Sequence, residues 1–214
     1  MFNDCHPDIP HGPSVSAYDA PMAAAPPVTG APAAPARTGL LVGFGLGAVI
    51  ALCFGAYARV HDPSGESVVV LFFSGQIQLK VWLATVAFVL AVLQVLSAMW
   101  MYGKIDIGSG APAWLGDAHK LMGTLAFLFT LPVAYHCLWS LGYTVDPTLD
   151  RVFVHSLFGC LFYGAFVSKV LVVRTENLPG WALPVAGAAV FTTLVVLWST
   201  SSFWFFTTFD GAKF

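Results

Sequence analysis

Five long apolar runs constrain what this chain can fold into more than any other feature of its sequence. They cover approximately residues 39–60, 79–102, 118–141, 152–174 and 182–206. Each is close to the ~20 residues that a helix needs to cross about 30 Å of hydrocarbon. Inside a bilayer every backbone polar group must be paired within its own segment, so each run is predicted to be helical. The sequence therefore predicts an all-α bundle of five transmembrane helices.

The composition indicates a chain that lies in a membrane. Hydrophobic residues make up 57% of the 214 residues and charged residues only 9%, whereas charged residues are about 25% of a typical soluble domain. So few charges cannot cover a surface that faces water. The net charge of −2 provides no basic field, which speaks against nucleic acid as a partner. The lipid bilayer is the predicted surrounding, and the plasma membrane is the predicted location.

Residues 1–38 form a region of a different kind. They hold eight of the fourteen prolines and few large aliphatic residues, so they cannot bury enough apolar surface to offset the entropy of ordering. We predict a disordered tail over 1–38 and a transmembrane domain over 39–214. If the N-terminus of a five-span chain is cytoplasmic, five of the nine basic residues lie on the cytoplasmic side and four on the other side. Cytoplasmic loops carry an excess of lysine and arginine, so this bias predicts a cytoplasmic N-terminus.

Small residues recur at every fourth position of the first apolar run. They are Gly39, Gly43, Gly47, Ala51 and Gly55. Small residues at this spacing form one flat face along a helix, which lets a neighbouring helix approach closely. The partner of this face is another helix of the same chain, a second copy or another subunit.

Three of the six histidines lie within the apolar runs. His119 opens the third run, His136 lies near its far end and His155 lies near the start of the fourth. Because the connector between these runs is short, we predict antiparallel neighbouring helices, with His136 and His155 at similar depths below one membrane face. Ionisable residues inside spans are costly and are usually functional, and imidazole is a common axial ligand of haem iron. The sequence therefore predicts that His136 and His155 bind the iron of haem b.

Glycines accompany two of these histidines. Gly123 follows His119 and Gly159 follows His155, each four residues later and so on nearly the same helix face. These glycines would leave room for a flat porphyrin, so they and His119 join the predicted cofactor-binding residues. His119 lies at the opposite membrane face, where Lys169 is the nearby candidate for a second ligand. The alternative for all three histidines is interfacial placement, where imidazole bonds a carbonyl or a headgroup.

Cysteine usage gives no metal signature. The four cysteines are Cys5, Cys53, Cys137 and Cys160, and no two are spaced as a CxxC pair. Three of them lie inside apolar runs. Free cysteine is often buried as a small hydrophobic residue, so these three are predicted to be packing residues.

Several ordered segments over about residues 70–206 carry a family resemblance. They are LFFSGQIQLKVWLATVAF, VLQVLSAMWMYGK, HKLMGTLAF, TLPVAYHCLW, RVFVHSLFGCLFYGAF and LPGW. In these segments the chain resembles an uncharacterised family of bacterial integral membrane proteins of the actinobacterial type. It is more distantly similar to membrane cytochromes b, including the ferric-reductase-like group, in which HxxxG helix starts and four histidines hold two stacked haems. Only three histidines lie in the bundle here.

Two functions from different classes follow from these features. The first is a membrane haem b protein that takes part in electron transfer with a quinol or a redox partner protein, as a component of an oxidoreductase. The alternative is a non-catalytic membrane subunit or scaffold of a larger complex, which would use the small-residue face of the first helix. Transport is disfavoured, because transporters carry more polar groups inside their spans and often show inverted repeats.

Overall fold

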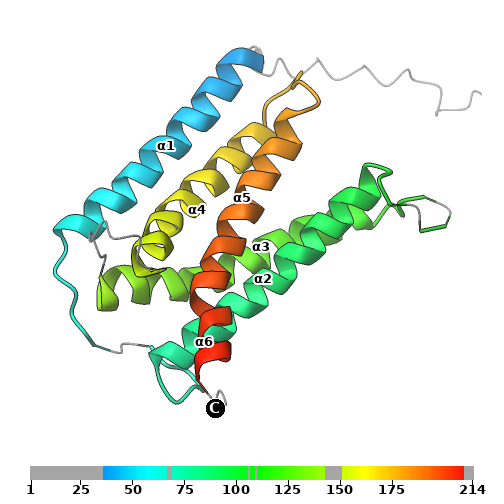
Figure 1. The fold of residues 1–214 in the computed structure, drawn as a ribbon. Coiled ribbons are helices and arrows are strands. Elements are labelled where there is room, and N and C mark those ends of the chain that lie inside the picture. Colours follow the sequence, from blue (N-terminus) through cyan, green and yellow to red (C-terminus); the bar gives the residue numbers. More distant parts are fainter. Residues whose placement is uncertain (1–35, 67–68, 106, 109, 143–150, 210–214) are drawn as a thin grey trace, which may run out of the picture. The chain divides into compact units, whose positions relative to one another are not determined.

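The computed structural model describes residues 36–66, 69–105, 107–108, 110–142 and 151–209. Within these residues every regular element is helical (Figure 1). The elements are α1 (Ala36–Val60), α2 (Gln76–Met101), α3 (Leu115–Tyr135), the π-helix η1 (His136–Leu141), α4 (Arg151–Val173), α5 (Ala182–Trp198), the π-helix η2 (Ser199–Phe203) and α6 (Trp204–Thr208).

Five continuous helical segments are long and apolar enough to cross a membrane. They are α1, α2, α3 with η1, α4, and α5 with η2 and α6. The predicted all-α fold with five spans is confirmed, and the chain is a multi-pass membrane protein. The first helix begins at Ala36 and not at residue 39. The predicted disordered tail falls almost entirely on residues 1–35, which lie outside the described residues.

The small-residue face of α1 packs against α4 of the same chain, and the two helices lie side by side in Figure 1. A Cβ atom built on Gly47 would collide with the Ser168 hydroxyl and the Gly164 carbonyl oxygen. A Cβ on Gly43 would lie 3.1 Å from Cγ2 of Val172. The glycines therefore let two helix backbones meet, which is the packing expected of small residues in membrane helices.

Polar and aromatic contacts join the remaining helices. α2 packs along α3, and α4 along α5. Between α2 and α5, the indole nitrogen of Trp198 donates to Oγ1 of Thr85 over 3.1 Å, and its ring stacks on Phe88 with centroids 4.5 Å apart. Between α3 and α4, Tyr163 donates its hydroxyl to the Thr130 carbonyl over 3.0 Å. This hydrogen bond connects α3 and α4.

Both π-helices have a local cause in the sequence. η1 follows Pro132, which lacks a backbone N–H and disturbs the helix around it. In η2, hydroxyl groups compete for backbone carbonyls: Oγ1 of Thr200 donates to the Val196 carbonyl over 2.7 Å, and Oγ of Ser201 to the Leu197 carbonyl over 2.6 Å. π-Helical turns are rare and are often found at functional sites. Here both turns border the same cavity.

Candidate functional site

A cavity of about 300 Å³ lies inside the bundle, bordered by all five spans. This volume is at the lower end of small-molecule sites, which measure about 300–1,000 Å³. Its wall is mostly apolar and aromatic. The polar side chains in the wall include Lys80, Cys137, Arg151, His155, Tyr163 and Ser201. A few polar groups in an apolar wall are typical of a binding site for a small organic molecule.

His155 is held in one orientation by η2. Its Nδ1 atom lies 3.0 Å from Oγ1 of Thr200. Because the Thr200 hydroxyl already donates its proton to the Val196 carbonyl, it accepts from His155, and Nδ1 carries the ring proton. His155 is part of the cavity wall, and its side chain also makes a hydrogen bond with the Cys137 thiol. The imidazole is thus contacted from the fifth span by Thr200 and from the third span by Cys137.

Arg151 closes the same end of the cavity from the first turn of α4. Its Nη1 donates to the Thr200 carbonyl over 2.5 Å, and its guanidinium carbon lies 3.7 Å from the centre of the Trp204 ring. Arg151 and Trp204 are both wall residues. A guanidinium over an indole face is a favourable cation–π arrangement. This contact ties the start of α4 to the end of the fifth span and places a fixed positive charge beside the cavity.

Cys137 lies in the cavity wall, and its thiol makes a hydrogen bond with the His155 side chain of α4. Lys80 and His155 are both close enough to its thiol to interact with it. Thr130 and Ala134 also line the cavity, and their spacing from Cys137 puts all three on one face of the third span. The cavity therefore joins a thiol, an amine and an imidazole from three different helices.

His136 has a different environment from that of its neighbour Cys137. It is fully buried, and its Nδ1 lies 2.8 Å from the Pro132 carbonyl oxygen, so Nδ1 carries the ring proton. Within the described part of the chain, Nε2 of His136 has no hydrogen-bond partner, nor has the buried hydroxyl of Ser140 one turn later. His136 is not among the described residues that form the cavity wall. The structure thus places His155 in the cavity wall, while His136 is buried in the bundle and is not among the described wall residues.

His119 lies at the α2–α3 interface. Its Nδ1 is 2.7 Å from Oγ of Ser97, and Ser97 donates to the Gln94 carbonyl over 3.0 Å. The Gln94 side chain in turn donates to the His119 carbonyl. Gly123 makes room for Gln94, since a Cβ there would lie 3.0 Å from the amide oxygen. Lys169 is near enough to interact with His119, but neither residue belongs to the described cavity wall.

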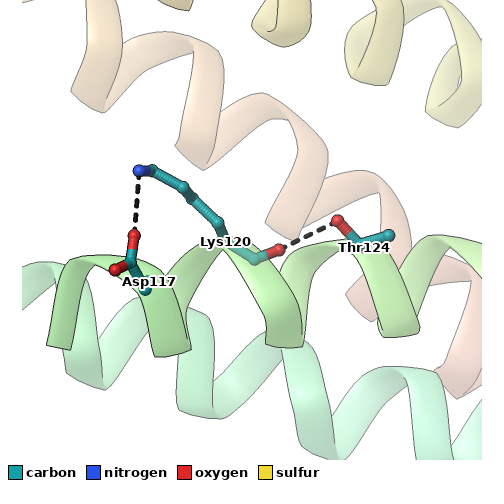
Figure 2. A network of polar contacts seen from close by, with 3 residues as sticks. All are labelled: Asp117, Lys120 and Thr124. Atoms are coloured by element: carbon teal, nitrogen blue, oxygen red, sulfur yellow. Dashed lines mark hydrogen bonds and ion pairs between the residues drawn. The ribbon is translucent and has the colours of Figure 1, made fainter. Parts of the chain in front are cut away.

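The charged residues next to His119 face outward. Lys120 pairs with Asp117 over 3.1 Å, and both side chains are largely exposed. The Lys120 carbonyl accepts a hydrogen bond from the Thr124 hydroxyl over 3.0 Å (Figure 2). An exposed pair of this kind contributes little to stability. We assign no binding role to Lys120.

Gly159 lies in the cavity wall, one helical turn after His155. The nearest atom to a Cβ built there would be Cδ2 of Leu197, 3.9 Å away. The glycine thus leaves open space at this point of the wall, and its role in cofactor binding stays a prediction.

Sequence reasoning missed three residues that build this site. Cys137 was treated as a packing residue, although its spacing from Thr130 could have placed both on one helix face. Lys80 was counted only toward topology. Thr200 belongs to the run Ser-Thr-Ser-Ser at residues 199–202, and a polar run inside the fifth span was a signal for function.

Comparison with known proteins places the chain in a family. Residues 40–213 match the model of DUF6529, a family of unknown function. The match covers most of the sequence, so the chain belongs to this family. The prediction of membership in an uncharacterised family is confirmed. No curated protein matches the chain, and no solved structure matches it.

Proposed function

We propose that the protein binds haem b in the cavity and takes part in electron transfer with a quinol or a redox partner protein. One observation carries this proposal. His155 is anchored at Nδ1 by Thr200 and lies in the wall of a largely apolar cavity. Metal-binding histidines are usually held in this way, because a hydrogen bond from the second nitrogen fixes the tautomer and the ring direction.

The other two histidines of the bundle follow the same pattern. Nδ1 of His136 is held by the Pro132 carbonyl, and Nδ1 of His119 by the Ser97 hydroxyl. Nε2 of His136 is buried and has no hydrogen-bond partner among the described residues, and its neighbour Cys137 lines the cavity. His136 therefore stays in the proposal as a predicted iron ligand.

The wall of the cavity fits the chemistry of haem. A porphyrin has an apolar face and two carboxylates at one edge, and this wall combines aromatic rings with cations at one end. Arg151 and Lys80 would hold the carboxylates, and Phe54, Tyr163 and Trp204 would contact the ring. When bound, haem would supply one-electron chemistry. The apolar wall and the hydrogen bond on His155 would tune its potential.

The scaffold alternative loses part of its support. It rested on the small-residue face of α1 and on the lack of buried acidic residues, and α4 packs on this face within the chain. No other observation here favours a purely structural role over cofactor binding. If the protein proves colourless in the following experiment, the result will favour this alternative.

The test is a visible spectrum of the purified full-length protein. The protein is produced in detergent from cells supplied with a haem precursor, and oxidised and reduced spectra are recorded. We expect a reducible Soret band that is lost in His155→Ala. The matched control is His61→Ala, which removes a histidine stacked on Trp139 outside the cavity wall. A folded wild-type protein that stays colourless with ample haem would overturn the proposal.

We also propose that the protein lies in the plasma membrane with a cytoplasmic N-terminus. The support is the distribution of lysine and arginine between the two sides of a five-span topology. A variant that keeps Cys5 and lacks Cys53, Cys137 and Cys160 tests this directly. A membrane-impermeant maleimide should label it only after the cells are permeabilised. Labelling of intact cells would show that the N-terminus lies outside the cell, and would contradict the proposed orientation.

A further inference from the structure

The connector that joins α1 to α2 (Figure 1) contains an apolar turn just before α2 begins. This apolar turn, residues 69–73, reads Val-Val-Leu-Phe-Phe and carries no charge. The backbone N–H of Phe73 donates to the Val70 carbonyl over 3.0 Å, which closes the turn around Leu71 and Phe72. Leu71 has a φ of 47°, in the left-handed region that a bulky residue rarely adopts. The apolar turn therefore has a defined shape, with Leu71 and Phe72 at its tip.

The two side chains at the tip are directed away from the protein. Phe72 is 99% exposed and Leu71 is 60% exposed. Within the described ranges, no other large hydrophobic side chain is as exposed as Phe72. Single apolar side chains on a surface are ordinary, but here a closed turn holds two adjacent ones outward. The described part of the chain does not cover this tip.

The apolar turn lies close to the level at which α2 enters the bilayer. The 26 residues of α2 extend over ~39 Å at ~1.5 Å per residue, which exceeds the ~30 Å of the hydrocarbon core. The first turns of α2 carry Gln76, Gln78 and Lys80, which suit the headgroup layer. Phe72 precedes Gln76 by four residues. Four residues reach at most ~13 Å, so the tip is within reach of a headgroup layer that is about 5–8 Å thick on each side.

A lipid surface suits this tip better than a protein partner does. Stable protein–protein interfaces bury about 1,200–2,000 Å² in total, which is far more than two side chains supply. Insertion into the bilayer needs no such area, because the five spans already hold the turn at the membrane and little freedom of motion is lost. Phenylalanine and leucine are side chains with which surface segments enter the boundary between headgroups and acyl chains.

We propose that the apolar turn is a membrane anchor, which inserts Leu71 and Phe72 into the headgroup–acyl boundary of the bilayer beside α2. The anchor goes beyond the proposed function and does not depend on haem. It fixes the depth of the first turns of α2, from which Ile77 and Lys80 line the cavity. The anchor thus holds one wall of the cavity at a constant level in the membrane.

The test measures the depth of residue 72 in the full-length protein. The amino acid para-trifluoromethyl-phenylalanine is incorporated in place of Phe72, and the protein is reconstituted in lipid nanodiscs. Fluorine relaxation is recorded with a water-soluble gadolinium chelate and with dissolved oxygen, which concentrates among the acyl chains. We expect oxygen to have the larger effect at residue 72. The matched control carries the same amino acid in place of Glu66, an exposed residue of the same connector, where the chelate should have the larger effect.

The outcomes decide between lipid, water and protein around the tip. A chelate effect at residue 72 as large as that at residue 66 would place the tip in water and overturn the anchor. A probe at residue 72 that neither agent reaches would also overturn it, because a second copy of the chain would then cover the tip. If the probe at residue 72 prevents folding, the same probe in place of Leu71 gives an independent reading, and oxygen should again have the larger effect. Neither reading involves haem, so failure of the anchor and failure of the proposed function are distinguishable.

Discussion

Nδ1 of His155 and Oγ1 of Thr200 are 3.0 Å apart, and they join the start of α4 to the π-helix η2 across 45 residues of sequence. The threonine hydroxyl accepts this bond because its own proton is given to the Val196 carbonyl. A residue that touches no cofactor therefore decides which nitrogen of the imidazole is available. Thr200 is a positioning residue for the cavity.

Replacing Thr200 should weaken haem binding without removing the iron ligand. Thr200→Val keeps the shape of the side chain and deletes the hydroxyl, so His155 loses its anchor. Loss of the hydrogen-bond partner of a metal-binding histidine commonly lowers metal affinity by about 10–100-fold. Haem titration of the apoprotein measures the change. Thr200→Ser, which keeps the hydroxyl, should bind as the wild type does. Equal affinity for the valine and serine variants would contradict the positioning role.

Removing the guanidinium of Arg151 should destabilise the bundle at the same end. Arg151→Ala deletes the bond to the Thr200 carbonyl and the contact with Trp204. A hydrogen bond from a charged group contributes about 1.5–3 kcal/mol, so we expect a loss of about 2 kcal/mol. Thermal unfolding in detergent, followed by tryptophan fluorescence, measures it. Arg151→Lys keeps the charge without the planar guanidinium, so its unfolding midpoint should lie between those of the wild type and Arg151→Ala. An unchanged midpoint for the alanine variant would refute this account.

The fold could be predicted from the sequence because its determinants are local. Run length and the absence of charge define a membrane span whatever its neighbours are. The spacing of small residues from Gly39 to Gly55 likewise marked a close helix contact. Which helix fills that contact depends on tertiary structure, and the sequence left three alternatives. In the structure α4 fills this contact, where Ser168 lies against Gly47 and Val172 against Gly43.

The site could be predicted only in part, because it depends on helix rotation. The depth of a residue below the membrane face follows from counting residues along its helix, and this count predicted similar depths for His136 and His155. Rotation is changed by Pro132 and by the π-helix that follows it, and no count of residues gives the result. In the structure His155 lines the cavity, and the third span contributes Cys137 and not His136 to its described wall. Gly123, expected beside a porphyrin, accommodates Gln94.

The contact between α1 and α4 should be sensitive to a single methyl group. Gly47→Ala places a Cβ against Ser168 and Gly164, where the helix backbones meet. Overpacking of this kind typically costs about 1–3 kcal/mol. The matched control is Gly45→Ala on the same helix, where a Cβ has no neighbour within 4 Å. Midpoints of thermal unfolding in one detergent compare them. Equal midpoints for the two variants would show that the small-residue face does not hold these helices together.

The network around His119 should prove structural and not part of a second haem site. Ser97→Ala removes the acceptor that holds Nδ1 of His119, and a lost hydrogen bond of this type costs about 1 kcal/mol. We expect a lower unfolding midpoint with the haem content per protein unchanged, because the cavity lies elsewhere. Thr124→Ala deletes an exposed hydroxyl of α3, the helix of His119 (Figure 2), and should change neither quantity. If Ser97→Ala instead halved the haem content, a second haem would lie at His119, with Lys169 as the neighbouring donor.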